Sequence, residues 1–201
     1  MKMILASQNK HKLKEIEKIT KNFGIELVTM EEAGLGDFDV VEDKDTFEGN
    51  SEKKAMEVME ASGFSSVADD SGLVVDALGG EPGVYSARFS GPEATYESNN
   101  KKLLEMMKDV PWEKRTARFV SVITAVFTDG RTLVARGEIE GHIAFREKGD
   151  GGFGYDPLFY VAEKEKTFAE LSGSEKNSIS HRANALEGFK KLLMAEGDLP
   201  K

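Results

Sequence analysis

The feature that most constrains the fold of this sequence is the run RFVSVITAVF at residues 118–127, in which both alternating sets of positions are mostly apolar. Successive side chains of a strand point to opposite faces of a sheet, so a strand with this pattern is covered on both faces. The run therefore predicts a central strand. Asp129-Gly130 follows and predicts a hairpin turn into a second strand at residues 132–139.

Strands and helices alternate along the rest of the chain. Further strands are expected at residues 1–6, 25–29 and 158–161, with two short strands in 67–78 interrupted at 69–72; helices are expected at 10–22, 45–63, 94–109 and from about 180. The second helix is predicted to start at Asp45, with Glu48 three residues later as in a capping box. This alternation with a hairpin predicts an α/β fold with a mixed central sheet, in a single domain spanning residues 1–201.

Composition narrows the class of protein. The net charge of −9 argues against broad binding to nucleic acid, which needs a basic surface. The chain has no cysteine, which excludes thiolate metal sites and fits a reducing compartment. Only four apolar residues open the chain before it turns polar, too few for a signal peptide, and no run is long enough to span a membrane. We expect a cytoplasmic protein without a membrane partner.

Two adjacent carboxylates, Asp69 and Asp70, lie in the segment ADDSGL at residues 68–73. Mg²⁺ prefers oxygen ligands and usually takes one or two carboxylates together with substrate phosphates. Neighbouring side chains of a strand face opposite ways, so the two carboxylates share a face only if a turn begins between them. An ordinary Asp-Ser-Gly turn is the alternative. Ser71 is not a hydrolase nucleophile, because Asp69 stands where the nucleophile elbow needs glycine.

The glycine-rich segment GDGGFG at residues 149–154 has the spacing of a dinucleotide-binding motif. That interpretation fails, because a helix should begin at the end of such a motif. Here the motif is followed by Tyr155, Asp156 and a strand-like run. Glycines let a backbone approach a flat base closely, and Phe153 and Tyr155 offer rings for stacking. A plain glycine-rich turn is the alternative.

Cationic and polar residues gather at two predicted helix starts. SQNKHK at residues 7–12 joins the first strand to the first helix, and SHR at 180–182 opens the last helix, with Lys176 just upstream. A helix N-terminus favours phosphate through its free N–H groups and its dipole. Solvated lysines at the first site and a surface His-Arg pair at the second are the alternatives.

Taken together, these segments resemble the inosine triphosphate pyrophosphatase family. The resemblance runs through SQNKHK, TFEGNSEKKA, ADDSGLVVDALGGEPGVYSARFSG, GGFGYDP and KNSISHRANAL, and so covers nearly the whole chain. It implies hydrolysis of non-standard purine nucleoside triphosphates (ITP, dITP, XTP) to the monophosphate and pyrophosphate, which cleans the nucleotide pool. It also implies an elongated α/β fold with two lobes, a cleft between them that holds the site, and a homodimer.

The resemblance implies roles for individual residues. Asp70, Asp69 and Lys54 would be catalytic, with Asp70 the proton acceptor, and Glu42 and Asp70 would hold Mg²⁺. The residues implied at the substrate are Ser7, Gln8, Asn9, Lys10, His11, Lys12, Ser71, Phe153, Gly154, Tyr155, Asp156, Lys176, His181 and Arg182. Arg182 can only donate hydrogen bonds, so it and nearby backbone N–H groups are expected to face the purine 6-oxygen that separates ITP and XTP from ATP.

The sequence departs from the family pattern at two positions. Gly49 stands where many family members have glutamate, so Glu42 and Glu48 would have to supply the metal with carboxylates. Gln8 replaces a small residue. Two other functions stay open: a pyrophosphatase acting on modified pyrimidine triphosphates, and a nucleotide-binding sensor without hydrolysis. The carboxylate pair argues against the sensor, because binding alone could use lysines and backbone groups.

Overall fold

A computed structural model describes residues 1–21 and 23–199, which build a seven-stranded sheet in the order β2-β1-β3-β4-β5-β6-β7. The strands are β1 (Lys2–Leu5), β2 (Glu26–Thr29), β3 (Ser66–Val75), β4 (Thr116–Val126), β5 (Thr132–Ile143), β6 (Phe159–Val161) and β7 (Lys166–Thr167). β1 runs parallel to β2 and β3, whereas β6 runs antiparallel to β5 and β7. The predicted α/β class with a mixed sheet is confirmed.

Five α-helices accompany the sheet in the described residues: α1 (Lys10–Thr20), α2 (Phe47–Ser62), α3 (Tyr96–Met106), α4 (Gly173–Ile179) and α5 (His181–Glu196). The predicted end of α1, residue 22, lies outside the described residues. The predicted start of α2 is wrong, because Thr46 caps this helix by accepting a hydrogen bond from the Gly49 N–H at 3.0 Å. The predicted stop is confirmed, since Gly63 adopts the left-handed conformation that ends helices.

The chain divides into two compact units. Unit 1 comprises Met1–Asp70, Ser121–Gly137 and Arg182–Lys201, and unit 2 comprises Ser71–Val120 and Glu138–His181. Strands β3, β4 and β5 contribute residues to both units. The hydrophobic core follows the same division, since each cluster of buried side chains belongs to one unit.

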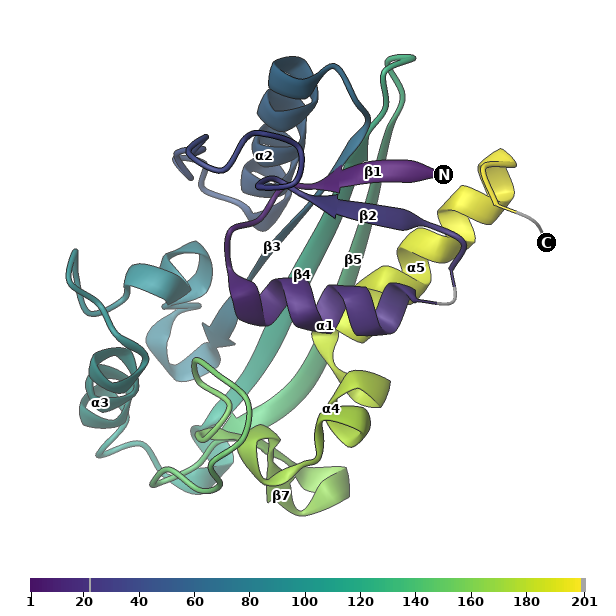
Figure 1. The fold of residues 1–201 in the computed structure, drawn as a ribbon. Coiled ribbons are helices and arrows are strands. Elements are labelled where there is room, and N and C mark those ends of the chain that lie inside the picture. Colours follow the sequence, from purple (N-terminus) through teal and green to yellow (C-terminus); the bar gives the residue numbers. More distant parts are fainter. Residues whose placement is uncertain (22, 200–201) are drawn as a thin grey trace. The chain divides into compact units, whose positions relative to one another are not determined.

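In unit 1 the sheet is covered on both faces (Figure 1). Met3 and Leu5 of β1 pack with α1 and α5, whereas Ile4 and Ala6 pack with α2. The alternation continues in β3, where Val67 belongs to the α1/α5 face and Ala68 to the α2 face. This two-sided burial explains why the strands are apolar at successive positions.

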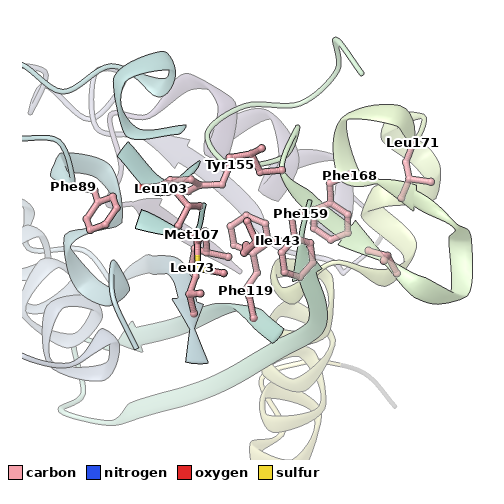
Figure 2. Packing of buried hydrophobic residues seen from close by; sticks show 14 residues of the cluster. Leu73, Phe89, Leu103, Met107, Phe119, Ile143, Tyr155, Phe159, Phe168 and Leu171 are labelled. Atoms are coloured by element: carbon pink, nitrogen blue, oxygen red, sulfur yellow. The ribbon is translucent and has the colours of Figure 1, made fainter. Parts of the chain in front are cut away.

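In unit 2 an aromatic core joins the sheet to the segments around it (Figure 2). Phe119 of β4 stacks with Phe168 at a ring distance of 5.7 Å and contacts Phe159 of β6 at 4.5 Å. Tyr155 lies in the same core. The glycine-rich loop at residues 149–154 is therefore anchored to the core immediately beyond its last glycine.

β3 differs from its prediction because it is a continuous strand of ten residues, with no interruption at 69–72. Asp69 and Asp70 are only 1% and 4% exposed. Both carboxylates find cationic partners inside unit 1, so the strand does not have to turn towards solvent to accommodate them. Within the described residues, no helix is long and apolar enough to cross a membrane.

Candidate active site

Side chains alternate between the two faces of β3, and this alternation determines the face on which each of its two carboxylates lies. Asp69 follows Val67 on the α1/α5 face, and Asp70 follows Ala68 on the α2 face. The two carboxylates could share a face only if a turn began between them, and β3 continues without a turn. The two adjacent aspartates therefore belong to two separate polar clusters.

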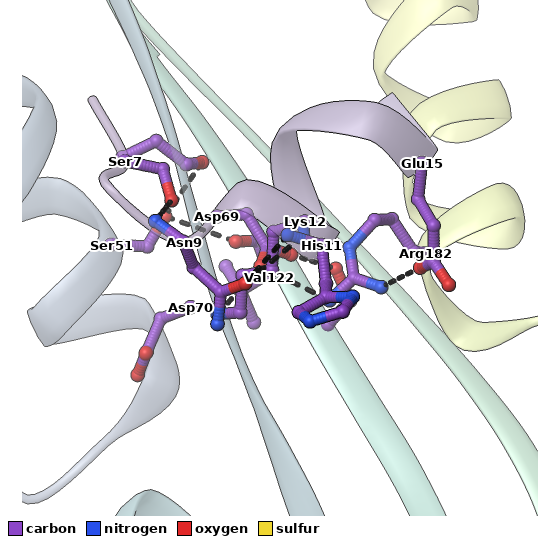
Figure 3. A network of polar contacts seen from close by, with 12 residues as sticks. Ser7, Asn9, His11, Lys12, Glu15, Ser51, Asp69, Asp70, Val122 and Arg182 are labelled. Atoms are coloured by element: carbon purple, nitrogen blue, oxygen red, sulfur yellow. Dashed lines mark hydrogen bonds and ion pairs between the residues drawn. The ribbon is translucent and has the colours of Figure 1, made fainter. Parts of the chain in front are cut away.

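Asp69 is the centre of the first cluster (Figure 3). Its Oδ2 lies 2.8 Å from Lys12 Nζ of α1 and 3.3 Å from Arg182 Nη2 of α5, and its Oδ1 accepts from the Ser121 hydroxyl of β4 at 2.6 Å. Arg182 also donates to the carboxylate of Glu15 on α1. Three secondary-structure elements are thus joined to one buried carboxylate.

The cluster keeps Asp69 ionised. Burial by itself would raise the pKa of Asp69, but the charges of Arg182 and Lys12 and the Ser121 hydroxyl hold this pKa well below its usual range. Burial likewise opposes the charge of Arg182, whose pKa the two carboxylates nevertheless raise. Asp69 is therefore ionised at neutral pH, between two cations.

Lys54 of α2 is the centre of the second cluster. Its Nζ lies 2.6 Å from Glu42 Oε1 and 3.3 Å from Asp70 Oδ1, and it donates to the backbone oxygen of Asp69 at 2.9 Å. Burial opposes the charge of Lys54, but Asp70 and Glu42 raise its pKa above the usual value. The segment between β2 and α2, helix α2 and strand β3 meet at this ammonium group.

One carboxylate oxygen of Asp70 can still accept a hydrogen bond or bind a cation. Its Oδ2 is buried and accepts no hydrogen bond from the residues that the structure describes. Burial raises the pKa of Asp70, and Lys54 and Lys12 only partly oppose that rise. A buried acceptor without a partner is costly, so this oxygen fits a cation or a proton donor.

The acidic side chains can form only a small metal shell. Among the described residues, no group of three or more histidine, aspartate or glutamate side chains is arranged to hold a metal ion. Glu42 and Asp70, which share Lys54, are two carboxylates. Two carboxylates still suit Mg²⁺, which commonly takes one or two from the protein and the rest from phosphates and water.

The loop before α1 is ordered by its own side chains. Asn9 caps the helix by accepting from the backbone N–H groups of His11 and Lys12 at 3.0 and 3.2 Å. Gln8 donates to the carbonyls of Gly36 and Phe38, so this departure from the family pattern fastens the loop to the segment between β2 and α2. Lys10 and His11 are exposed, while Lys12 points to Asp69.

Gly49, the second departure, has no room for a side chain. A Cβ atom there would lie 2.9 Å from Lys44 Cβ and 3.1 Å from Thr46 Oγ1. The Glu48 carboxylate accepts from Arg136 at 2.7 Å and does not join Asp70 at Lys54 in this structure. Glu42 is thus the carboxylate of this segment that joins Asp70 at Lys54.

Unit 2 contains a separate polar cluster. Asp156 Oδ2 accepts from Lys176 Nζ of α4 at 2.6 Å and from the Phe153 N–H at 2.9 Å. Lys176 Nζ also lies 4.8 Å from the centre of the Phe153 ring. The ion pair is almost fully buried, and the Phe153 ring is half-buried. The structure therefore brings together three of the predicted base-site residues.

Other predicted site residues have different surroundings. Tyr155 is 5% exposed and its hydroxyl donates to the Ser86 carbonyl at 2.8 Å, so its ring is not free to stack on a base. Burial raises the pKa of Tyr155. His181 stacks on Phe119 at 4.8 Å. Arg182 is 1% exposed, and its two terminal nitrogens donate to Glu15 and Asp69. Ser71 continues β3 and is half-buried.

Two residues of the Asp69 cluster were missed by the sequence analysis. Glu15 lies one helical turn after Lys12, a spacing that places both on one side of α1. Ser121 is one of two hydroxyl residues, with Thr124, in the mostly apolar run at 119–127, and it is completely buried. A buried polar residue needs a partner, so its position in the strand was a usable signal.

Comparisons with known proteins agree over almost the whole chain. The sequence model of the Ham1 family matches residues 3–192. The dITP/XTP pyrophosphatase of Clostridium perfringens is 50% identical over 195 residues, covering 94% of this chain and 95% of that protein. The dITP/XTP pyrophosphatase of Thermoanaerobacter pseudethanolicus is 47% identical, covering 96% and 97%. The solved Ham1 protein of Staphylococcus aureus superposes with a TM-score of 0.87 at 39% identity, covering 98% and 100%.

Proposed function

Because the chain belongs to the Ham1 family, we propose that it hydrolyses ITP, dITP and XTP to the monophosphate and pyrophosphate and so removes non-standard purine nucleotides from the pool. Two of its curated relatives are named dITP/XTP pyrophosphatase. The observation that carries the proposal is the pair of cation-linked carboxylate clusters in unit 1. Together they supply fixed cations for phosphates and one buried carboxylate oxygen with no partner in the described residues.

The reaction joins a water oxygen to the α-phosphorus and breaks the bond from that phosphorus to the bridging oxygen of the leaving pyrophosphate. We assign the proton of the attacking water to Asp70. Its carboxylate is a suitable acceptor because Oδ2 is buried and has no partner in the described residues. Lys54 and Lys12 would offset the charge of the phosphates. Ser71 and the segment at residues 7–12 would bind the substrate around them.

The donor set fits Mg²⁺, because Asp70 Oδ2 is an unpartnered buried anion oxygen close to the Glu42–Lys54 pair. Glu42 and Asp70 would hold the ion. When bound, Mg²⁺ supplies charge neutralisation to the phosphates. Asp69 points to the other face of β3 than Asp70, and it would keep Lys12 in place through their ion pair.

We assign the purine base to the cluster of Phe153, Asp156 and Lys176 in unit 2. The Phe153 ring is half-buried, and the loop around it is rich in glycine, which favours close approach of a flat base. Residues 1–201 would act as a single domain, since three strands contribute to both units. The family resemblance supports a homodimer, and the nucleotide pool as substrate source supports action in the cytoplasm.

A panel of nucleoside triphosphates tests this function. The purified protein is incubated with Mg²⁺ and ITP, XTP, ATP, GTP or a modified pyrimidine triphosphate, and monophosphate and pyrophosphate are measured. We expect rapid hydrolysis of ITP and XTP and slow hydrolysis of ATP. A preference for pyrimidines would favour the other pyrophosphatase function, and binding without any product would favour a sensor.

A further inference from the structure

Helix α3 contacts the glycine-rich loop of unit 2 at two positions one helical turn apart. The Tyr96 ring lies 6.1 Å from the Phe153 ring, and the Asn100 side-chain amide donates to the Gly154 carbonyl at 3.2 Å. Asn100 is 4% exposed, so this hydrogen bond is shielded from water. The same side of α3 thus holds two consecutive residues of the loop.

The hydrogen bond from Asn100 fixes one peptide plane. The bond between Gly154 and Tyr155 is not among the cis peptides of the chain, so its C=O and N–H point in opposite directions. The Gly154 carbonyl points to Asn100, and the Tyr155 N–H therefore points away from it. Gly154 has φ +62°, which favours glycine, and Tyr155 is held by its buried ring and by Ser86.

The loop that contains this peptide has two backbone N–H groups that can still donate a hydrogen bond. Within the residues that the structure describes, the N–H groups of Gly154 and Tyr155 donate to no acceptor. Loop N–H groups without a protein acceptor can donate to an acceptor from outside, either water or a ligand. Arg182, the side-chain donor that the sequence suggested, is already engaged by Asp69 and Glu15.

We propose that Asn100 is a positioning residue for base selectivity, which holds the Gly154–Tyr155 peptide so that its N–H faces an acceptor oxygen of the substrate base. This inference rests on the proposed function. Hypoxanthine and xanthine present an oxygen at the purine 6-position, whereas adenine presents an amino group, which would meet the N–H donor to donor. A site whose buried donors are left unpaired by the wrong substrate discriminates strongly.

The neighbouring Asn99 offers a matched control. It is 3% exposed and lies on the same helix, but its amide donates to the carbonyls of Ser86 and Ala87 and accepts from the Ser90 N–H. Substitution of either asparagine by aspartate keeps the volume and removes the donor. N99D thus releases the Ser86 and Ala87 carbonyls, and only N100D releases the Gly154 carbonyl.

The experiment compares kcat/KM for ITP and ATP in wild type, N100D, N100L and N99D, with Tm measured for each. We expect the ITP:ATP ratio to fall about tenfold or more in both Asn100 variants, through loss on ITP. N99D should lose Tm, and because it reaches Tyr155 only through the Ser86 carbonyl, its ratio should fall much less than that of N100D. An unchanged ratio in folded Asn100 variants would overturn the role of Asn100, whereas a wild type with no ITP preference would overturn the proposed function instead.

A second measurement uses the native protein and does not depend on a variant that folds. Inosine monophosphate and adenosine monophosphate are titrated separately into ¹⁵N-labelled protein. The Tyr155 amide should shift strongly with the inosine compound and weakly with the adenosine compound, while the Asn99 side-chain amide stays in place. Equal shifts of the Tyr155 amide with both compounds would contradict the inference.

Discussion

Lys12 of α1 and Asp69 of β3 form an ion pair of 2.8 Å in which the carboxylate is completely buried. The pair ties the first turn of the helix that follows residues 7–9 to the central part of the sheet in unit 1. Since Arg182 and Ser121 bind the same carboxylate, Asp69 connects the proposed phosphate-binding segment with β4 and α5.

The first prediction concerns stability against pH. The pKa of Asp69 is lowered in the folded protein, so its stabilisation is fully present above the unfolded pKa of about 3.9 and is lost as the pH falls towards the folded value. We expect the free energy of unfolding, measured in urea at several pH values, to decrease below about pH 4. Asp69→Asn should flatten this dependence, and an identical slope in both proteins would contradict the assignment.

The second prediction concerns Arg182. Removing this side chain leaves the buried Asp69 with Lys12 and takes from the half-buried Glu15 the cation that the two carboxylates share, so Arg182→Ala should lose about 3 kcal/mol in the free energy of unfolding. Arg182→Lys keeps a charge and should lose less. In the lysine variant we expect kcat/KM for ITP and ATP to fall together. A selective loss on ITP would restore Arg182 as a residue that reads the base.

The third prediction concerns Asp70. Asp70→Asn keeps the size of the side chain and removes both the proton acceptor and the anionic ligand, so hydrolysis of ITP should fall by at least about 10³-fold. The folded state should persist, as judged by circular dichroism. We also expect Mg²⁺ to raise the Tm of the wild type and not that of this variant. Turnover near that of wild type would remove Asp70 from the mechanism.

The fourth prediction concerns Lys54. Lys54→Met keeps much of the packing of the side chain but leaves Glu42 and Asp70 without their common cation. We expect kcat to fall by about 10²-fold or more at saturating ITP, because charge at the phosphates is lost. Lys53→Met is a matched control, since Lys53 pairs with the exposed Asp43. Equal, small effects of both substitutions would assign Lys54 a structural role only.

The sequence by itself determined the elements that depend on local pattern. The two-sided apolar run at 118–127 became the central strand β4, and the helical spacing after residue 10 became α1. Gly63 ends α2 as predicted, because a left-handed cap is a local property of glycine. The order of the motifs likewise identified the family, since it needs no knowledge of contacts.

The tertiary structure alone decided which of the motif residues share a cluster. Adjacent Asp69 and Asp70 separate to opposite faces of β3, because that strand continues and its side chains alternate. The Arg182 side chain binds Asp69 and Glu15 inside unit 1, and the Tyr155 ring packs in the core of unit 2. These partners lie up to 167 positions away in sequence, and pairing over such separations depends on the packing of whole elements, which no local pattern records.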